Sequence, residues 1–166
     1  MDENSMCTIM GKALDLEEEG MKFYTKCKET TKDENGKEMF SYLAKEEIIH
    51  YNKVAEIFKT YLNKGYCDYI AARQDKPESG VFEKNFPGGG LNDKTDILAA
   101  LNIGINAEEN SIKLYKQLAE DSENDEAKMA FQKLATEEQK HKSILENEIE
   151  FVTGTGEFHD FKQVTS

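Results

Sequence analysis

The sequence contains the same short motif, Glu-x-x-His, at two corresponding places in an internal repeat. Glu47 and His50 in the first copy correspond to Glu138 and His141 in the second, which lies 91 residues later (141 − 50 = 91). Other identical pairs at this offset include Glu17 with Glu108, Tyr24 with Tyr115, Phe40 with Phe131, Leu43 with Leu134, and Glu46 with Glu137. A repeat of this kind predicts two similar halves related by a pseudo-two-fold axis.

Apolar residues recur at helical spacing on both sides of a central stretch that is rich in helix breakers. Between residues 63 and 93 lie both prolines and three consecutive glycines at 88–90. Weaker breaks occur at 31–36 and 121–125, where Asp, Asn and Ser are available to cap helices. We therefore predict a single domain over residues 1–166, with helices at about 6–30, 34–61, 94–120 and 124–151, a crossover connection at about 63–93, and a tail at about 153–166.

Two helical hairpins joined by a long connection are typical of one class of all-α protein. The expected fold is a ferritin-like four-helix bundle, because an up-and-down bundle would not need a crossover of about 30 residues. Each helix would be roughly 40 Å long at 1.5 Å per residue. The two Phe of the tail, Phe158 and Phe161, are expected to pack against another part of the molecule.

The apolar stripe of each predicted helix includes one glutamate near its midpoint, Glu17, Glu47, Glu108 and Glu138 in chain order. Four carboxylates in a dry interior would repel one another, since burial of an unpaired ion costs several kcal/mol, so a cation is expected there. The i,i+3 spacing lets His50 and His141 reach the same centre. Four anionic and two neutral ligands balance two divalent ions, and oxygen-rich ligation with one imidazole per ion favours iron, with manganese as an alternative.

Several other residues of the inward stripes have two possible roles. Gly20 and Ser111, each three residues beyond a glutamate, either leave space for a small oxidant or allow close helix packing. Tyr24 and Tyr115 are expected to be core aromatics whose hydroxyls hydrogen-bond the carboxylates around the metal, with a radical or proton relay as the alternative. His159 lacks the neighbouring glutamates and is interpreted as a surface or interface histidine.

Charge and composition argue against several classes of function. A net charge of −12 would repel phosphate backbones and anionic lipid, so neither nucleic acid nor a membrane is an expected partner. No apolar run approaches the roughly 18 residues of a membrane helix, and the N-terminal residues do not look like a secretory signal. The three cysteines, Cys7, Cys27 and Cys67, form no C-x-x-C pair and are expected to be small buried thiols in a reducing cytoplasm.

Four segments, 13–24, 43–50, 107–115 and 134–141, resemble the ferritin-like domain of the rubrerythrin family. The resemblance implies that Glu17 and Glu108 are terminal ligands and that Glu47 and Glu138 bridge two irons. His50 and His141 would each bind one iron. Members of this family commonly reduce hydrogen peroxide with two electrons taken from a diferrous centre.

The sequence departs from that family pattern in two respects. Rubrerythrins carry a further glutamate three residues after the terminal ligand of the third helix, and this chain has Ser111 there. His50 is therefore expected to be a permanent ligand, and peroxidase turnover is expected to be less efficient than in rubrerythrins with that glutamate. The paired C-x-x-C motifs of a rubredoxin domain do not occur, so electrons would come from a separate donor protein such as a rubredoxin.

The sequence is compatible with three functions. The first is a cytoplasmic, homodimeric diiron oxidoreductase that reduces peroxide or dioxygen. The second is an iron or manganese binding, storage or ferroxidase-like protein without peroxidase turnover; storage would usually need a cage, so gel filtration separates it from a dimer. The third is a metal-free interaction bundle, for which Glu47→Ala or His50→Ala would leave the metal content unchanged.

Overall fold

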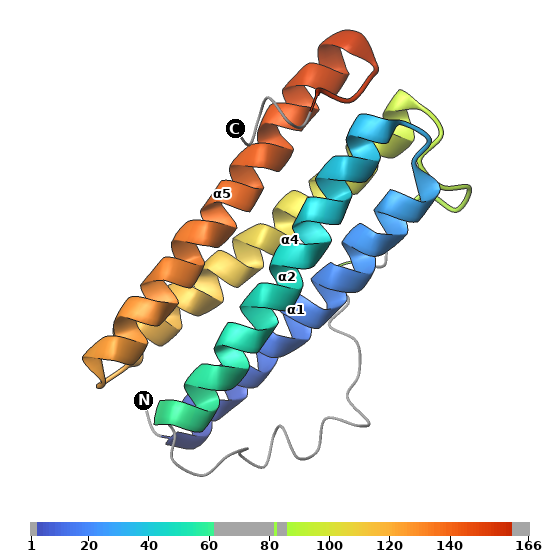
Figure 1. Cartoon of the computed structure of the whole chain (residues 1–166). Coiled ribbons are helices and arrows are strands. Elements are labelled where there is room, and N and C mark those ends of the chain that lie inside the picture. The colour runs from blue at the N-terminus through green and yellow to red at the C-terminus, as the bar shows by residue number, and fades with distance from the viewer. Residues whose placement is uncertain (1–2, 62–81, 83–85, 161–166) are drawn as a thin grey trace.

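The computed structural model describes residues 3–61, 82 and 86–160, and it shows four long helices packed side by side. They are α1 (Glu3–Thr30), α2 (Glu34–Tyr61), α4 (Lys94–Asp121) and α5 (Asp125–Thr155). Figure 1 shows the bundle as two layers, with α1 and α2 forming one hairpin and α4 and α5 the other. The prediction of an all-α four-helix bundle built from two hairpins is confirmed.

The direction of the helices distinguishes this bundle from a simple up-and-down arrangement. In Figure 1, α4 runs in the same direction as α2, so the end of α2 and the start of α4 lie at opposite ends of the bundle. Most of the crossover predicted at 63–93 lies outside the described residues. Between the hairpins, α1 packs closely on α4, whereas α2 and α5 face each other across a looser seam.

Capping side chains set the starts of three helices at the breaks expected from the sequence. Asp33 Oδ1 accepts hydrogen bonds from the backbone N–H groups of residues 35 and 36 at the start of α2. Asp93 accepts from the N–H of Asp96 at 2.9 Å, and Asn124 accepts from the N–H of Ala127 at 2.9 Å. These contacts satisfy N–H groups that have no partner within the helix.

The last helix is longer than predicted, since α5 continues to Thr155 and the described tail begins at Gly156. Gly154 is tolerated inside the helix, whereas Gly156 adopts φ 77° and donates its N–H to the carbonyl of Val152 at 2.7 Å. The left-handed conformation that glycine adopts easily therefore ends the helix at the second glycine rather than near residue 151.

The interior consists of two apolar clusters with a polar layer between them. The cluster toward the α1–α2 loop includes Phe23, Phe40, Leu43, Leu101 and Leu145. The cluster toward the α4–α5 loop includes Leu14, Val54, Phe58, Phe131 and Leu134. The glutamates and histidines of the repeat lie between these clusters in each helix, so the apolar layers hold a polar centre at mid-bundle.

The tail packs back onto the first hairpin through Phe158. Its side chain is 4% exposed, and its ring meets that of Phe40 edge to face with centroids 5.7 Å apart. A Cβ on Gly36 would lie 2.8 Å from the Phe158 ring, so the glycine leaves the space that the ring occupies. The expected packing is confirmed for Phe158, while Phe161 lies outside the described residues.

The cysteines differ from one another in the structure. Cys27 is free and fully buried, and Cys7 is buried and disulfide-bonded. The expectation of a buried thiol is therefore wrong at Cys7, and Cys67 lies outside the described residues. Among the helices described, none combines the length and apolar character needed to cross a membrane.

Candidate metal centre

Each helix contributes one glutamate to the polar layer at the middle of the bundle. The carboxylates come from Glu17 of α1, Glu47 of α2, Glu108 of α4 and Glu138 of α5, and none of these residues is more than 3% exposed. They converge because each stands where an apolar residue would otherwise continue the inward stripe of its helix. Burial in all four helices at one level gives a compact acidic centre that bulk water does not reach.

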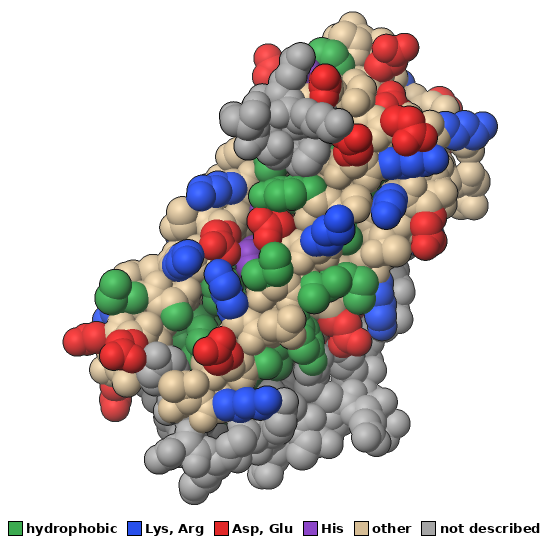
Figure 2. All heavy atoms as spheres, viewed as in Figure 1, with side chains coloured by type: hydrophobic (Ala, Val, Ile, Leu, Met, Phe, Trp, Pro, Cys, Tyr) green, Lys and Arg blue, Asp and Glu red, His purple; other side chains and the backbone are tan. Residues whose placement is uncertain are grey.

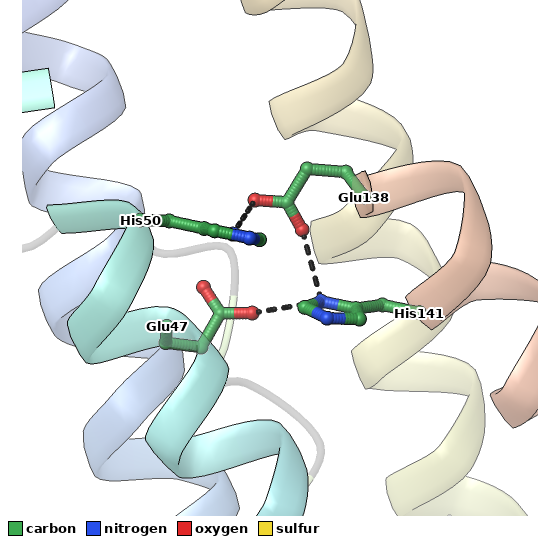
Figure 3. A group of neighbouring side chains, drawn as sticks. All are labelled: Glu47, His50, Glu138 and His141. Atoms are coloured by element: carbon green, nitrogen blue, oxygen red, sulfur yellow. Dashed lines mark hydrogen bonds and ion pairs between the residues drawn. The ribbon is translucent and has the colours of Figure 1, made fainter. Parts of the chain in front are cut away.

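The two histidines enter this centre from α2 and α5, one turn beyond the glutamates of the same helices (Figure 3). His50 Nδ1 lies 3.0 Å from Glu138 Oε1 and 3.7 Å from Glu17 Oε2. His141 Nδ1 lies 3.2 Å from Glu138 Oε2, 3.5 Å from Glu47 Oε1 and 3.6 Å from Glu108 Oε1.

The two imidazole rings are stacked, with centroids 5.2 Å apart and planes inclined by 16°. The Nδ1 atom of each ring faces carboxylate oxygens at the centre of the bundle. Figure 3 shows the rings projecting toward each other from α2 and α5, with the carboxylates of Glu47 and Glu138 beside them.

Two buried tyrosines hold the carboxylates of α1 and α4 from the opposite helix. The Tyr24 hydroxyl of α1 donates to Glu108 Oε1 at 2.7 Å, and the Tyr115 hydroxyl of α4 donates to Glu17 Oε1 at 2.6 Å. Each hydrogen bond therefore joins the two hairpins and fixes one oxygen of its carboxylate. The expectation that both hydroxyls contact carboxylates agrees with the structure, and the exchange between hairpins is a feature that only the packing reveals.

Small residues allow side chains to pack closely around this centre. A Cβ on Gly20 would lie 3.1 Å from Glu47 Oε2, closer than an ordinary contact, so Gly20 allows Glu47 to approach α1. Gly104 likewise allows the Tyr24 hydroxyl to approach α4, because a Cβ added at Gly104 would lie 3.3 Å from that hydroxyl. Ser111 is buried at 7% exposure. At Gly20 the geometry therefore favours close packing over open space.

Burial and mutual repulsion shift the pKa values of the acidic groups in different directions. Burial and the neighbouring carboxylates raise the pKa of Glu17 and Glu47 well above the usual value, and burial with the charge of Glu108 raises the pKa of Glu138 to about 8. For Glu108, burial acts to raise the pKa, but contacts with Glu138 and His141 outweigh it, so its pKa is lowered. Burial also opposes the charged form of His141, yet Glu108 and Glu138 raise its pKa to about 10. Ionisation of all four carboxylates together is therefore disfavoured in the protein alone.

The donor atoms of this centre fit a metal ion. One donor atom from each of Glu47, His50, Glu138 and His141 can be chosen so that all four lie within 4.8 Å of one another. Fully buried oxygens without a hydrogen-bond partner include Glu17 Oε2, Glu47 Oε1 and Glu138 Oε2. Buried polar atoms normally have partners, and a divalent cation would satisfy these oxygens and remove the repulsion. The mixture of carboxylate and imidazole is a donor set that iron and manganese accept.

The structure brings all six predicted ligand residues into this layer, and their assignment as ligands stays a prediction. His159 lies elsewhere, in the tail, with its ring 4.7 Å from that of Phe151. One nearby residue was missed from the sequence, Glu137, whose carboxylate reaches His50 from the outer side. The only signal for it was its identity with Glu46 in the repeat.

Comparison with protein families gives an independent result. The sequence model of the family described as Rubrerythrin matches residues 8–149. The chain belongs to the rubrerythrin family. The matched region spans both hairpins and includes every predicted ligand, and together with the buried cluster it supports a diiron-carboxylate protein with a metal site.

The fold of this rubrerythrin family member is similar to that of a solved structure, a hypothetical protein from Pyrococcus furiosus. The TM-score is 0.70 at 23% sequence identity, and the match covers 92% of this chain and 93% of the other. At that identity the likeness shows the fold alone. A search of curated proteins returns no match.

Proposed function

We propose that this protein is a non-haem diiron-carboxylate oxidoreductase that reduces hydrogen peroxide or dioxygen with electrons from a separate donor. The observation that carries the proposal is the convergence of four buried carboxylates and two imidazoles on one centre that contains buried oxygens without partners. Glu17, Glu47, His50, Glu108, Glu138 and His141 are the proposed ligands. Membership of the rubrerythrin family supports the same chemistry.

Two iron ions held by these residues would supply one electron each, and hydrogen peroxide with two electrons and two protons gives two molecules of water. The surrounding residues prepare the site for that reaction. Tyr24 and Tyr115 orient the carboxylates of Glu108 and Glu17 through hydrogen bonds of 2.7 and 2.6 Å. The apolar clusters on both sides keep bulk water away and strengthen electrostatic interactions inside.

Electrons would come from a small redox protein such as a rubredoxin, because the sequence provides no C-x-x-C pairs for an iron–thiolate site of its own. A homodimeric assembly and a cytoplasmic location belong to the same proposal. Manganese in place of one or both irons is compatible with the same donor set.

The test is an anaerobic titration of the iron-loaded protein with hydrogen peroxide. The protein is loaded with Fe(II), its iron content is measured, and peroxide is added while the charge-transfer absorption of ferric iron is followed. We expect two irons per chain and one equivalent of peroxide consumed for each pair. A ferrous protein that peroxide leaves unchanged would rule out the peroxidase function.

A second function is favoured by one residue. Ser111 stands where rubrerythrins carry an additional glutamate, and its burial leaves a smaller and neutral group beside the centre. That difference favours iron binding, storage or ferroxidase-like oxidation without peroxidase turnover. In that case dioxygen would oxidise the bound iron faster than peroxide does, reduced donor protein would not restore the ferrous state, and storage would require a large cage instead of a dimer on size-exclusion chromatography.

A further inference from the structure

Two glutamates next to the proposed ligands occupy the same place in the repeat but have different partners. Glu137 of α5 reaches across the seam to α2, where its Oε2 lies 2.8 Å from His50 Nε2. Its other oxygen lies 3.7 Å from Lys53 Nζ. The counterpart in the first hairpin, Glu46, instead accepts a hydrogen bond of 2.9 Å from the Tyr42 hydroxyl on its own helix.

The sequence explains why the two glutamates behave differently. The residue corresponding to Tyr42 in the second hairpin is Lys133 (42 + 91 = 133), so Glu137 has no tyrosine one turn before it. The residue corresponding to Lys53 is Ile144 (53 + 91 = 144), so no lysine draws Glu46 across the seam. Glu137 is therefore directed toward α2, whereas Glu46 is held on its own helix.

The contact with Glu137 affects which ring nitrogen of His50 faces the centre. His50 Nδ1 points inward, 3.0 Å from Glu138 Oε1, while Nε2 points outward to Glu137. The contact between His50 Nε2 and Glu137 Oε2 is short enough for an ion pair, but it does not have the geometry of a hydrogen bond. A carboxylate beside Nε2 favours a proton on that nitrogen, which leaves the lone pair of Nδ1 for a metal.

The second histidine has no such support. His141 Nδ1 also faces the centre, where the carboxylates of three glutamates lie 3.2 to 3.6 Å away. Within the described part of the chain, no carboxylate forms an ion pair with its Nε2. The outer side of the ring instead borders Tyr42, whose ring is edge to face with centroids 6.3 Å apart.

The geometry points to Glu137 as a positioning residue that fixes His50 and makes the two metal positions unequal, the one served by His50 being the tighter. This inference rests on the metal site of the proposed function. Glu137 remains 24% exposed at the side chain, so it forms the outer edge of the centre on the α2–α5 seam. Figure 2 shows a histidine side chain between acidic groups near the middle of this face.

The test is a titration of the metal-free protein with Co(II) under argon, followed by calorimetry and visible absorption. For the wild-type chain we expect two ions with distinguishable affinities. Glu137→Gln keeps the shape of the side chain but removes its charge, and the tighter affinity should fall by about 10 to 100-fold, the usual effect of an outer partner of a ligating histidine. Glu46→Gln removes the same charge from the matching position and should change neither affinity by more than about twofold.

A second measurement separates positioning from a general change of structure or charge. In NMR spectra of the Co(II) protein, the ring N–H of a ligating histidine gives a shifted signal, which survives in water only when the proton exchanges slowly. We expect that the His50 signal is present in wild type and Glu46→Gln and is lost in Glu137→Gln. Glu137→Asp, which keeps the charge but shortens the reach, should lower the tighter affinity less than Glu137→Gln does.

The outcomes distinguish this inference from the proposed function. If wild type binds two ions and Glu137→Gln matches Glu46→Gln in both measurements, the role of Glu137 is wrong and the metal site stands. Equal affinities in the wild-type chain would also overturn the inference. If the wild-type chain binds no metal, both are wrong. Circular dichroism confirms that each variant is folded, and Glu137→Asp provides the test if Glu137→Gln does not fold.

Discussion

The two hairpins agree at the centre of the bundle and differ around it. At the centre, each hairpin supplies two glutamates, one histidine and one tyrosine at corresponding positions. Around it, corresponding positions hold different residues with different contacts. The pairs are Gly36 and Ala127, Tyr42 and Lys133, Lys53 and Ile144, and Ile57 and Glu148.

This comparison shows which features the two halves share for a physical reason. A pair of cations at a pseudo-two-fold axis requires similar donors from both halves, so the buried donors are repeated. The surrounding positions each meet a different neighbour, because the tail packs on only one hairpin and the seam has different residues on its two sides.

The largest effect is expected where the hairpins agree. Glu47→Gln and Glu138→Gln each remove one carboxylate from the centre, and each should reduce bound iron from two ions per chain to one or none. The affinity should fall by more than about 100-fold, since even partners outside the ligand shell cost 10 to 100-fold. Elemental analysis of the anaerobically loaded protein measures the result. Glu120→Gln, an exposed site on α4, is the control, and two ions retained in either centre variant would contradict a shared site.

The next effect concerns the tail, which packs on the first hairpin only. Phe158→Ala should lower the free energy of unfolding by about 3 kcal/mol, as for other buried phenylalanines. Gly36→Ala should lower it by about 1 to 3 kcal/mol, because the new Cβ would lie 2.8 Å from the Phe158 ring. Urea denaturation measures both.

The matched control for the tail is Gly154→Ala, a helical glycine with no atoms near an added Cβ. It should raise the free energy of unfolding by roughly 0.5 to 1 kcal/mol through helix propensity alone. If Gly36→Ala stabilised the protein as much as Gly154→Ala does, the interpretation of the tail contact would be wrong.

A smaller effect should separate the two tyrosines. In protein freed of metal by a chelator, Tyr24→Phe should cost about 1.5 to 3 kcal/mol, because the pKa of its acceptor Glu108 is lowered and the carboxylate is charged. Tyr115→Phe should cost only about 0.5 to 1.5 kcal/mol, because the pKa of Glu17 is raised and its acceptor is more often neutral. Chemical denaturation at pH 7 compares them, and equal or reversed costs would mean that the carboxyls of Glu17 and Glu108 carry similar charge.

The smallest effect is a dependence on pH at Glu148, which replaces the apolar Ile57 of the first hairpin. Burial raises the pKa of Glu148. The backbone N–H of His159 donates a hydrogen bond to Glu148 Oε1 at 2.6 Å, which acts in the opposite direction but does not outweigh burial. Because its pKa is higher in the folded than in the unfolded state, folding favours the protonated form, and stability is lost as pH rises through the folded pKa. The unfolding free energy of wild type relative to Glu148→Gln should therefore be greater at pH 4 than at pH 7. A difference that is constant with pH, measured by denaturation at both values, would contradict a buried acid at this site.

Much of the fold could be predicted because the relevant signals are local. The sequence predicts the boundaries of the second helix, 34–61, as they are observed. The reason is that the cap at Asp33 and the helix breakers that follow the end of the helix act on residues close to them in the chain. The sequence predicts an end of α5 that is too early, because Gly154 and Gly156 are both possible helix ends. In the structure the helix ends at Gly156, and the residues after it place Phe158 against the first hairpin. The disulfide at Cys7 was also missed, since spacing alone does not bring two cysteines together.

The candidate site was predictable in its composition and not in its contacts. The repeat and the inward stripes predicted the six residues that meet at the centre. They did not predict that Tyr24 and Tyr115 would each hold the carboxylate of the other hairpin, or that Glu137 would differ from Glu46. Long side chains reach between helices, and which partner they meet depends on how the helices are set against one another.

By itself, the sequence determined four amphipathic helices in two similar hairpins, each with acidic residues on its buried face, because helical periodicity depends only on the spacing of residues along the chain. The tertiary structure decided that these acidic residues share one dry centre, that α2 and α4 run in the same direction, and that one outer glutamate meets His50. Those features depend on distances between helices, and such distances are set by the packing of two apolar layers on either side of the polar one.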